Sequence, residues 1–168
     1  MIIGFTGHQK IELPDRWGWV KDQLRQALRE IAEPGDRVTS SLAKGGDQLI
    51  SQLAIAEGLS IEVVVPCDGY ESCFTDVNEA AQYKELLGKA EEVITLDFAA
   101  PSEDAFLAAG RKVVERSDRI IALWNGKNAV GKGGTGDIVA YARELGRQVI
   151  HVNPDSMTAY CLDPFERK

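Results

Sequence analysis

Apolar runs of strand length alternate with helical patterns along almost the whole chain. Residues 61–65 and 120–123 are almost entirely apolar, which is typical of parallel strands buried on both faces. Strands and helices that alternate in this way predict an α/β fold, a doubly wound Rossmann-like sandwich with a mainly parallel sheet of about six strands. The predicted strands are residues 1–6, 37–41, 61–66, 92–96, 119–124 and 148–152.

Helices with recognisable ends lie between these strands. Asp15 can cap a first helix whose apolar face ends at Ile31, and Ser102 can cap a later helix. Further helices are predicted over residues 46–57 and 135–145, whereas residues 70–90 fit either one helix or a loop followed by a helix. The predicted domain is therefore 1–153, and residues 154–168, with two prolines and little periodicity, form a C-terminal tail.

The charge and the cysteines narrow the classes of partner. The chain has 19 basic and 26 acidic residues and a formal net charge of -7, and a nucleic-acid surface needs clustered Lys and Arg. We therefore expect no nucleic acid as a partner, and no membrane either, because no apolar stretch reaches the roughly 20 residues that span a bilayer. Three cysteines without the paired spacing of a zinc site indicate a reducing cytoplasm, with no metal and no cofactor expected.

Open parallel sheets bind ligands beyond the carboxyl ends of their strands, and glycines, hydroxyl groups and charges recur in the segments that follow the strands here. Gly45 and Gly46 open a helix in this position, or make a simple turn. The candidate ligand-binding residues are Gly7, His8, Ser41, Lys44, Gly45, Asp47, Trp124, Lys132, Gly133, Gly134, Thr135 and Gly136.

The segment Gly131–Gly136 contains four glycines in six residues. Glycines let backbone N–H groups approach an anion, and the helix that follows adds free N–H groups and its positive dipole end. Thr135 offers a hydroxyl group and Lys132 a counter-charge; the alternative is a flexible loop whose glycines serve only the turn. The segment is not a P-loop, because Gly133 stands where that motif needs Ser or Thr, and the first turn lacks the glycine fingerprint of NAD dehydrogenases.

Several candidates also have a structural interpretation. His8 is either a ligand contact or the source of a hydrogen bond that orders its loop. Asp47 either binds ribose hydroxyls or is only a favourable charge in the first turn of a helix. Trp124 either stacks on a base or belongs to the core, and a solvated helix face is the default for Arg111 and Arg116.

Short motifs in the chain resemble the SLOG superfamily, which includes the Lonely Guy phosphoribohydrolases and the Rossmann domain of DNA-processing protein A. The final third is also similar to nucleoside 2-deoxyribosyltransferases. The likeness covers residues 1 to about 153 and implies a nucleotide or nucleotide-derived ligand, with phosphate at 133–135 and ribose near the loop after the second strand. The motifs are T-G-H at 6–8, S-S-L-A-x-G-x-D at 40–47, S-D-R-I-I-A-L-W at 117–124 and G-G-T-G-D at 133–137 with Y-A at 141–142.

The chain departs from this family at the catalytic positions. Lonely Guy enzymes cleave an N-glycosidic bond with a glutamate after their glycine turn, and residues 138–140 of this chain are apolar where the family is acidic. Asp137 is adjacent but at another helical angle, and Arg111 matches the family's arginine only with a two-residue offset. Because glycoside hydrolysis needs a placed carboxylate, we expect a nucleotide-binding or sensing module. The alternative is an N-glycoside hydrolase or transferase acting on nucleoside monophosphates, with Asp137 or Asp47 as its carboxylate.

The expected partners are a nucleotide-like small molecule and further copies of the chain, as a dimer or higher homo-oligomer.

Overall fold

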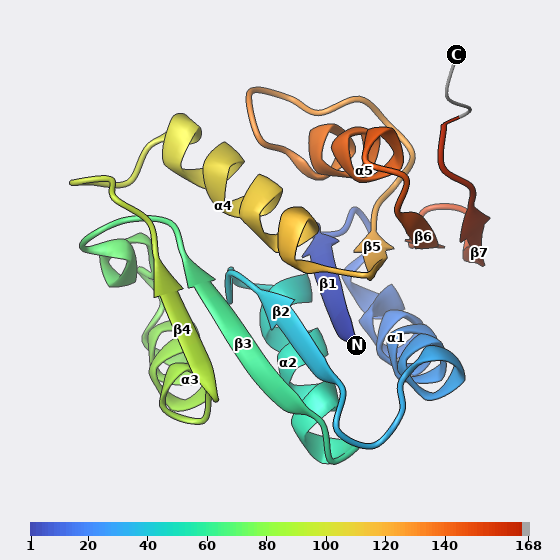
Figure 1. Ribbon diagram of the computed structural model, residues 1–168, viewed down its shortest axis with the longest axis horizontal. Helices are drawn as coiled ribbons and strands as arrows, with labels where there is room; N and C mark the ends of the chain where they lie inside the picture. The colour runs from blue at the N-terminus through green and yellow to red at the C-terminus, as the bar shows by residue number, and fades with distance from the viewer. Residues whose placement is uncertain (166–168) are drawn as a thin grey trace.

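The computed structural model describes residues 1–165 and contains a seven-stranded sheet in the order β4-β3-β2-β1-β5-β6-β7 (Figure 1). Every predicted strand is present, and these six strands pair in parallel, which confirms the α/β class and the mainly parallel sheet. The strands are β1 (Ile2–Gly7), β2 (Arg37–Ser40), β3 (Ser60–Val65), β4 (Glu92–Thr95), β5 (Arg119–Leu123), β6 (Gln148–Asn153) and β7 (Thr158–Leu162).

The seventh strand lies in the segment predicted to be a tail. β7 is antiparallel to β6, with Tyr160 opposite His151. Its first four residues are exposed, so it lacks the alternation of buried and exposed side chains that a half-covered strand shows in its sequence. The strand was missed because pairing with β6, and not burial of one face, defines it.

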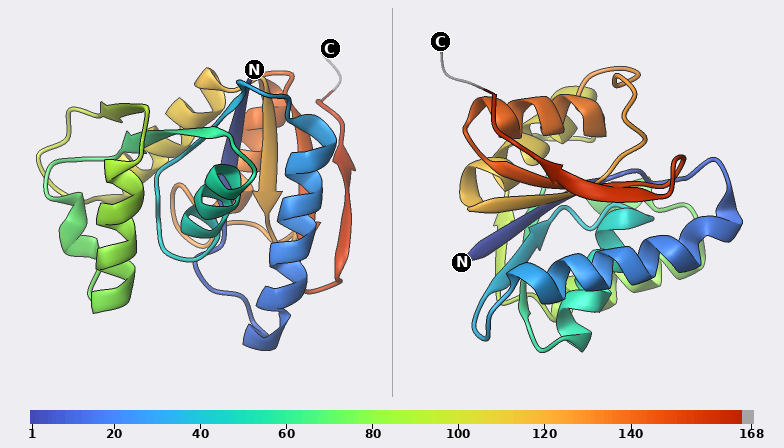
Figure 2. Two further views of the ribbon diagram at one scale, coloured as in Figure 1. Left: turned by 90° about the horizontal axis from the view of Figure 1, so that it is seen from below. Right: turned by 90° about the vertical axis from the view of Figure 1, so that its right-hand side faces the viewer.

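Helices cover both faces of the sheet (Figure 2). One layer contains α1 (Trp17–Ile31), α2 (Gly46–Ala56) and α3 (Val77–Gly88), and the other contains α4 (Glu103–Arg116) and α5 (Thr135–Glu144). The uncertain stretch 70–90 is resolved as a short 3-10 turn, Tyr70–Cys73, followed by α3. Asp76 separates the two because its carboxylate caps α3, accepting hydrogen bonds from the first N–H groups of that helix.

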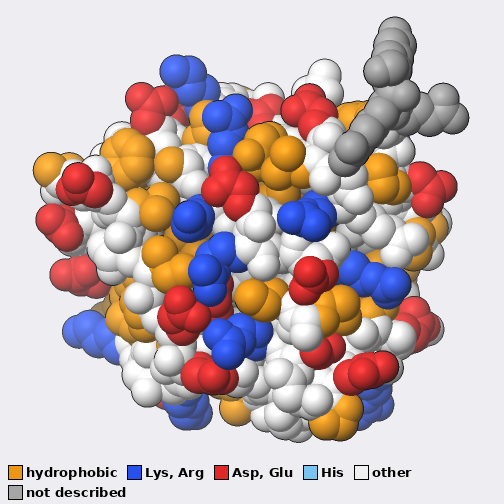
Figure 3. Space-filling view, viewed as in Figure 1, with side chains coloured by type: hydrophobic (Ala, Val, Ile, Leu, Met, Phe, Trp, Pro, Cys, Tyr) orange, Lys and Arg blue, Asp and Glu red, His pale blue; other side chains and the backbone are white. Residues whose placement is uncertain are grey.

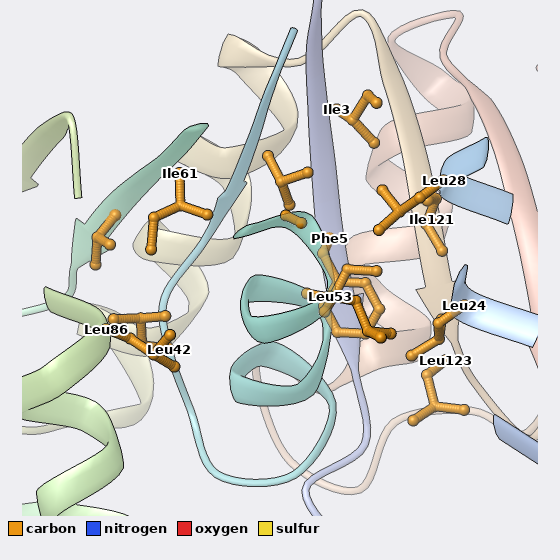
Figure 4. Close-up of a cluster of buried hydrophobic side chains, with 14 of the residues drawn as sticks. Ile3, Phe5, Leu24, Leu28, Leu42, Leu53, Ile61, Leu86, Ile121 and Leu123 are labelled. Atoms are coloured by element: carbon orange, nitrogen blue, oxygen red, sulfur yellow. The ribbon is translucent and has the colours of Figure 1, made fainter. Parts of the chain in front are cut away.

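The larger core lies between the sheet and the layer of α1 and α2. Figure 4 shows Leu24 and Leu28 of α1 beside Leu123 and Ile121 of β5. Alternate residues of β5 point to the other face, where Ile120 and Ala122 pack against α4 and α5. The apolar runs predicted to form buried strands are buried, including Val63, Val65, Ile121 and Leu123, and so is Ile3 of β1.

The order of the strands determines where in the fold a ligand-binding crevice can lie. The chain builds β1 to β4 in one direction across the sheet and then returns to add β5 on the other side of β1. The connections that leave β1 and β5 therefore diverge over opposite faces, and a crevice opens between them at the carboxyl edge.

Candidate functional site

A cavity of about 810 Å³ occupies this crevice, within the usual size range of ligand pockets. The segments that follow β1, β2, β3 and β5 line it together with α4. Gly45 and Trp124 do not line it, although both were candidates. The other candidate ligand-binding residues all do: Gly7, His8, Ser41, Lys44, Asp47, Lys132, Gly133, Gly134, Thr135 and Gly136.

His8 joins the loops around the crevice. Its backbone N–H donates to Leu123 O at 3.0 Å and its carbonyl accepts from Gly46 N at 3.1 Å. Its Nε2 accepts from Asn125 N at 3.1 Å, so the proton of the neutral ring is on Nδ1, which lies 3.4 Å from Thr135 Oγ1. The Thr135 hydroxyl thus accepts from His8 and keeps its own proton for a ligand. The loop-ordering interpretation of His8 is observed, and direct ligand contact stays a prediction.

The N-terminus of α5 opens into the cavity with free donors. Gly134 is its N-cap, and Gly134 O accepts from the N–H groups of Asp137 and Ile138. Within residues 1–165, the N–H groups of Thr135 and Gly136 have no acceptor. Unpaired N–H groups at the positive end of a helix form a favourable place for an anion.

Two glycines of the segment have a packing role that the sequence did not reveal. A Cβ on Gly133, whose φ is +78°, would lie 2.9 Å from the Cα of Leu107 in α4, and a Cβ on Gly134 would lie 2.7 Å from the Cβ of Ala129. Close packing of the loop therefore accounts for these glycines without a ligand. The case for an anion rests instead on the free N–H groups of α5.

Asp137 does not face the cavity. Its Oδ2 accepts a hydrogen bond from Gly133 N at 3.1 Å, which closes the glycine loop onto the first turn of α5. Asp137 is also absent from the cavity lining. The geometry does not support the prediction that this carboxylate could serve catalysis.

Asp47 is the carboxylate that lies in the cavity. It is 7% exposed, and its Oδ2 accepts from Ser41 N at 3.1 Å and from Ala43 N at 3.4 Å. These bonds hold a tight turn in which the buried Leu42 has a positive φ of 55°. Burial raises the pKa of Asp47 to about 7, because two backbone N–H groups offset only part of the lost hydration.

An aromatic wall forms another part of the cavity, and sequence reasoning missed it. The rings of Tyr70 and Phe74 lie with centroids 5.3 Å apart, and Phe106 of α4 lies 6.2 Å from Tyr70. All three residues line the cavity. The available signal was the position of Tyr70 directly after β3, at the same carboxyl edge, with Phe74 four residues later.

The remaining candidates lie outside the cavity. Trp124 donates from Nε1 to Lys127 O at 2.8 Å and packs its ring against His151, so it belongs to the core. Arg111 lies over the ring of Tyr141 on the exposed face of α4 and does not line the cavity. Gly45 packs against Gln9, whose carbonyl oxygen is 2.3 Å from the place of a Cβ on Gly45.

Arg116 is not on a solvated helix face, contrary to the default expectation. Its guanidinium makes two hydrogen bonds to Glu62, whose side chain is fully buried in β3, and one to Glu92 at 3.2 Å. This cluster lies at the amino edge of the sheet, away from the cavity. Arg116 therefore serves the fold.

Residues 1–165 contain no group of three His, Cys, Asp or Glu side chains placed to hold a metal ion. None of the helices in this range combines the length and the apolar character needed to cross a membrane.

Comparisons with known proteins give structural matches only. No protein-family profile and no curated protein matches the sequence. DNA processing protein A from Helicobacter pylori matches with a TM-score of 0.59 and 16% identity over 90% of this chain, and the protein from Streptococcus pneumoniae with 0.63 and 17% over 89%. The chain shares its fold with DNA processing protein A. It spans 64% and 49% of the lengths of those two chains.

A structural-genomics protein, TM1055, has the same fold, with a TM-score of 0.54 and 14% identity over 89% of this chain and 72% of its own. These three neighbours show that the chain has a Rossmann-like fold.

The sequence-based prediction that excluded nucleic acid as a partner is wrong. The Helicobacter pylori protein binds single-stranded DNA, so this fold is compatible with that ligand. Net charge describes the whole surface, whereas binding depends on the charge at one place. Lys44, Lys127 and Lys132 all line the cavity although the chain as a whole is acidic.

Proposed function

We propose that the cavity binds a nucleotide or nucleotide-derived small molecule, as a binding or sensing module, with the phosphate at the N-terminus of α5. One observation carries this proposal: the N–H groups of Thr135 and Gly136 have no acceptor within residues 1–165, and the Thr135 hydroxyl next to them is oriented by His8. Three donors then converge on one place at the positive end of a helix. A phosphate group, with several acceptor oxygens, matches that arrangement.

Each lysine of the cavity pairs with a carboxylate that is not part of the lining, so the anion is assigned to the N–H groups of α5 and not to a lysine. Lys44 pairs with Glu79 at 3.8 Å, Lys127 with Asp155 at 3.6 Å and Lys132 with Asp104 at 3.6 Å. A single-strand binding groove combines an unbroken basic track with stacking platforms. On the face drawn in Figure 3, basic and acidic side chains are interspersed.

The test uses Thr135→Ala, which removes the hydroxyl and keeps the helix. Calorimetry should show that AMP and inorganic phosphate bind the variant about tenfold more weakly or worse, because a hydrogen bond to a charged group is lost. Thr158→Ala, on the exposed strand β7, is the matched control and should bind as the wild type does.

Two results would overturn this proposal. One is a wild-type protein that binds neither AMP nor phosphate, and the other is Thr135→Ala with unchanged affinities. An oligonucleotide that binds far more tightly than AMP, with a steep dependence on salt, would identify single-stranded nucleic acid as the ligand instead.

Hydrolysis of an N-glycosidic bond is a second candidate, and Asp47 favours it. Asp47 is a buried carboxylate in the cavity with a pKa raised by burial, the condition in which a carboxyl group can donate or accept a proton near neutral pH. Incubation with AMP and CMP, followed by chromatography for free base and ribose phosphate, tests this activity. Release of base by the wild type but not by Asp47→Asn would establish an enzyme.

A further inference from the structure

Two polar atoms that belong to largely buried residues of the cavity lining have no hydrogen-bond partner in the described part of the chain. Both backbone donors to Asp47 bind Oδ2, and within residues 1–165 Oδ1 has no partner. The hydroxyl of Tyr70, a residue only 5% exposed, has none there either. Both residues line the same cavity, and the charge of Asp47 adds to burial in raising the pKa of Tyr70. Neither atom is enclosed by the protein, so a ligand in the cavity can reach both and supply their hydrogen-bond partners.

Aromatic rings stand beside these two groups. Phe74 packs edge-on against Tyr70, and Phe106 extends the wall from α4. The next residue of α4, Leu107, packs against Gly133 of the glycine segment. The helix α4 therefore passes over both the aromatic wall and the loop that opens α5 (Figure 1), so one ligand can contact both places.

We infer that Asp47, Tyr70 and Phe106 form a subsite for a heteroaromatic base, in which Asp47 Oδ1 accepts a hydrogen bond from an exocyclic amino group. This inference rests on the proposed function, which places the phosphate of the same ligand at α5. The rings supply the stacking surface that any base can use. The free oxygen supplies the discrimination between bases, because an ionised carboxylate accepts hydrogen bonds and donates none.

The proposed base subsite predicts a difference in affinity between AMP and IMP and between CMP and UMP. AMP and CMP carry an amino group where IMP and UMP carry a carbonyl oxygen, and the carbonyl would face the carboxylate without a donor. At about pH 8.5 Asp47 is ionised, because its pKa is about 7. Under that condition AMP should bind about tenfold more tightly than IMP, and CMP more tightly than UMP, as one hydrogen bond to a charged group predicts.

Asp47→Asn should reverse this preference. The N–H groups of Ser41 and Ala43 need an acceptor, so the amide oxygen of the asparagine takes the place of Oδ2 and its NH2 group faces the cavity. A donor then replaces an acceptor, and IMP and UMP become the tighter ligands. Asp76→Asn is the matched control, because Asp76 Oδ1 also accepts from two backbone N–H groups but lies outside the cavity; it should keep the wild-type preference.

A second variant tests the rings even if Asp47→Asn does not fold. Phe106 is 38% exposed, and Phe106→Ala should weaken all four nucleotides about tenfold through lost stacking while the affinity for inorganic phosphate stays unchanged. Circular dichroism checks the fold of each variant.

The outcomes separate this inference from the proposed function. Equal affinities for AMP and IMP in the wild type, a wild-type preference retained in folded Asp47→Asn, or a Phe106→Ala variant that binds nucleotides normally would each overturn the base subsite and leave the phosphate site standing. If none of the four nucleotides binds the wild type, the proposed function fails and the subsite fails with it.

Discussion

A buried carboxylate from each edge of the parallel sheet, Glu62 at the amino edge and Asp47 at the carboxyl edge, allows a comparison of their surroundings. At the amino edge, Glu62 is bound by the guanidinium of Arg116, with Arg37 3.8 Å away. At the carboxyl edge, within residues 1–165, Asp47 is held only by two backbone N–H groups and keeps one oxygen without a partner. The buried carboxylate at the amino edge is therefore paired with an arginine, whereas the buried carboxylate at the carboxyl edge can still accept a hydrogen bond.

The pKa values show the physical consequence. Burial alone would raise the pKa of both carboxyl groups, but the hydrogen bonds and charge of Arg116 reverse the effect at Glu62, whose pKa is lowered. Asp47 has no cation to do this, so its pKa rises to about 7. A paired buried carboxylate maintains the fold, whereas a carboxylate with an unused oxygen in a cavity is available to a ligand.

The amino edge should give the largest effect on stability. Arg116→Met leaves Glu62 buried with only the more distant Arg37, and removing one partner of a buried ion pair costs about 3–5 kcal/mol of the free energy of unfolding. Urea denaturation measures this loss. Arg111→Met, in the same helix, removes only an exposed contact with Tyr141 and should cost less than about 1 kcal/mol. If both variants lose the same amount, the comparison between the two edges is wrong.

The loop after β2, at the carboxyl edge, packs closely against its backbone neighbours. Substitutions at two glycines test how much stability depends on this packing. Gly45 and Gly58 both have positive φ, +80° and +79°, but a Cβ on Gly45 would meet Gln9 whereas one on Gly58 has open space. Gly58→Ala should cost about 1 kcal/mol for the strained backbone, and Gly45→Ala about 2–3 kcal/mol because the clash is added. Thermal or urea unfolding of both variants checks the difference; equal losses would show that the loop after β2 can move away from Gln9.

The pH dependence of stability should show the smallest change in a single step, at most about 1.4 kcal/mol for one pH unit, and it isolates Asp47. The pKa of Asp47 is about 7 in the folded chain, against an ordinary value of 3.8. Between these values the folded state keeps a proton that the unfolded chain releases, so the free energy of unfolding falls as the pH rises, by at most about 1.4 kcal/mol per pH unit. Burial lowers the pKa of His151, which makes stability rise with pH in the acid part of this range.

The difference between the wild type and Asp47→Asn removes the contribution of His151, because both chains share it. Urea unfolding at several pH values from about 4 to 8 should therefore give curves that diverge, with the variant gaining relative to the wild type as the pH rises. Parallel curves would mean that Asp47 titrates as an ordinary exposed carboxyl group. Its position in the cavity would then not change its acid–base behaviour.

Much of the architecture follows from local sequence. The apolar runs around Val63 and Ile121 predict buried parallel strands, and capping residues such as Ser102 mark where helices begin. The same reasoning placed His8, Ser41 and Thr135 at one edge of the sheet, and the structure brings them into one cavity. It failed at β7, where no buried face imposes a pattern.

Candidates of the same residue type were separated only by the structure. Asp47 and Asp137 both stand in the first turn of a helix, yet one reaches the cavity and the other turns back onto Gly133. Trp124 and Tyr70 both follow a strand closely, yet only Tyr70 lines the cavity. The direction of each side chain depends on neighbours far away in the chain, which leave no local periodicity.

The sequence by itself determined the class of the fold, the positions of its elements except β7 and those within residues 70–90, and the edge of the sheet where polar loops gather. These properties follow from hydrophobic period, capping and turn chemistry, all of which act over a few residues. Only the tertiary structure decided the strand order, the pairing of Arg116 with Glu62, and the presence of Asp47, Tyr70 and Phe106 in the lining of one cavity. Those contacts join segments separated by many residues, because burial in a common core, and not local preference, brings them together.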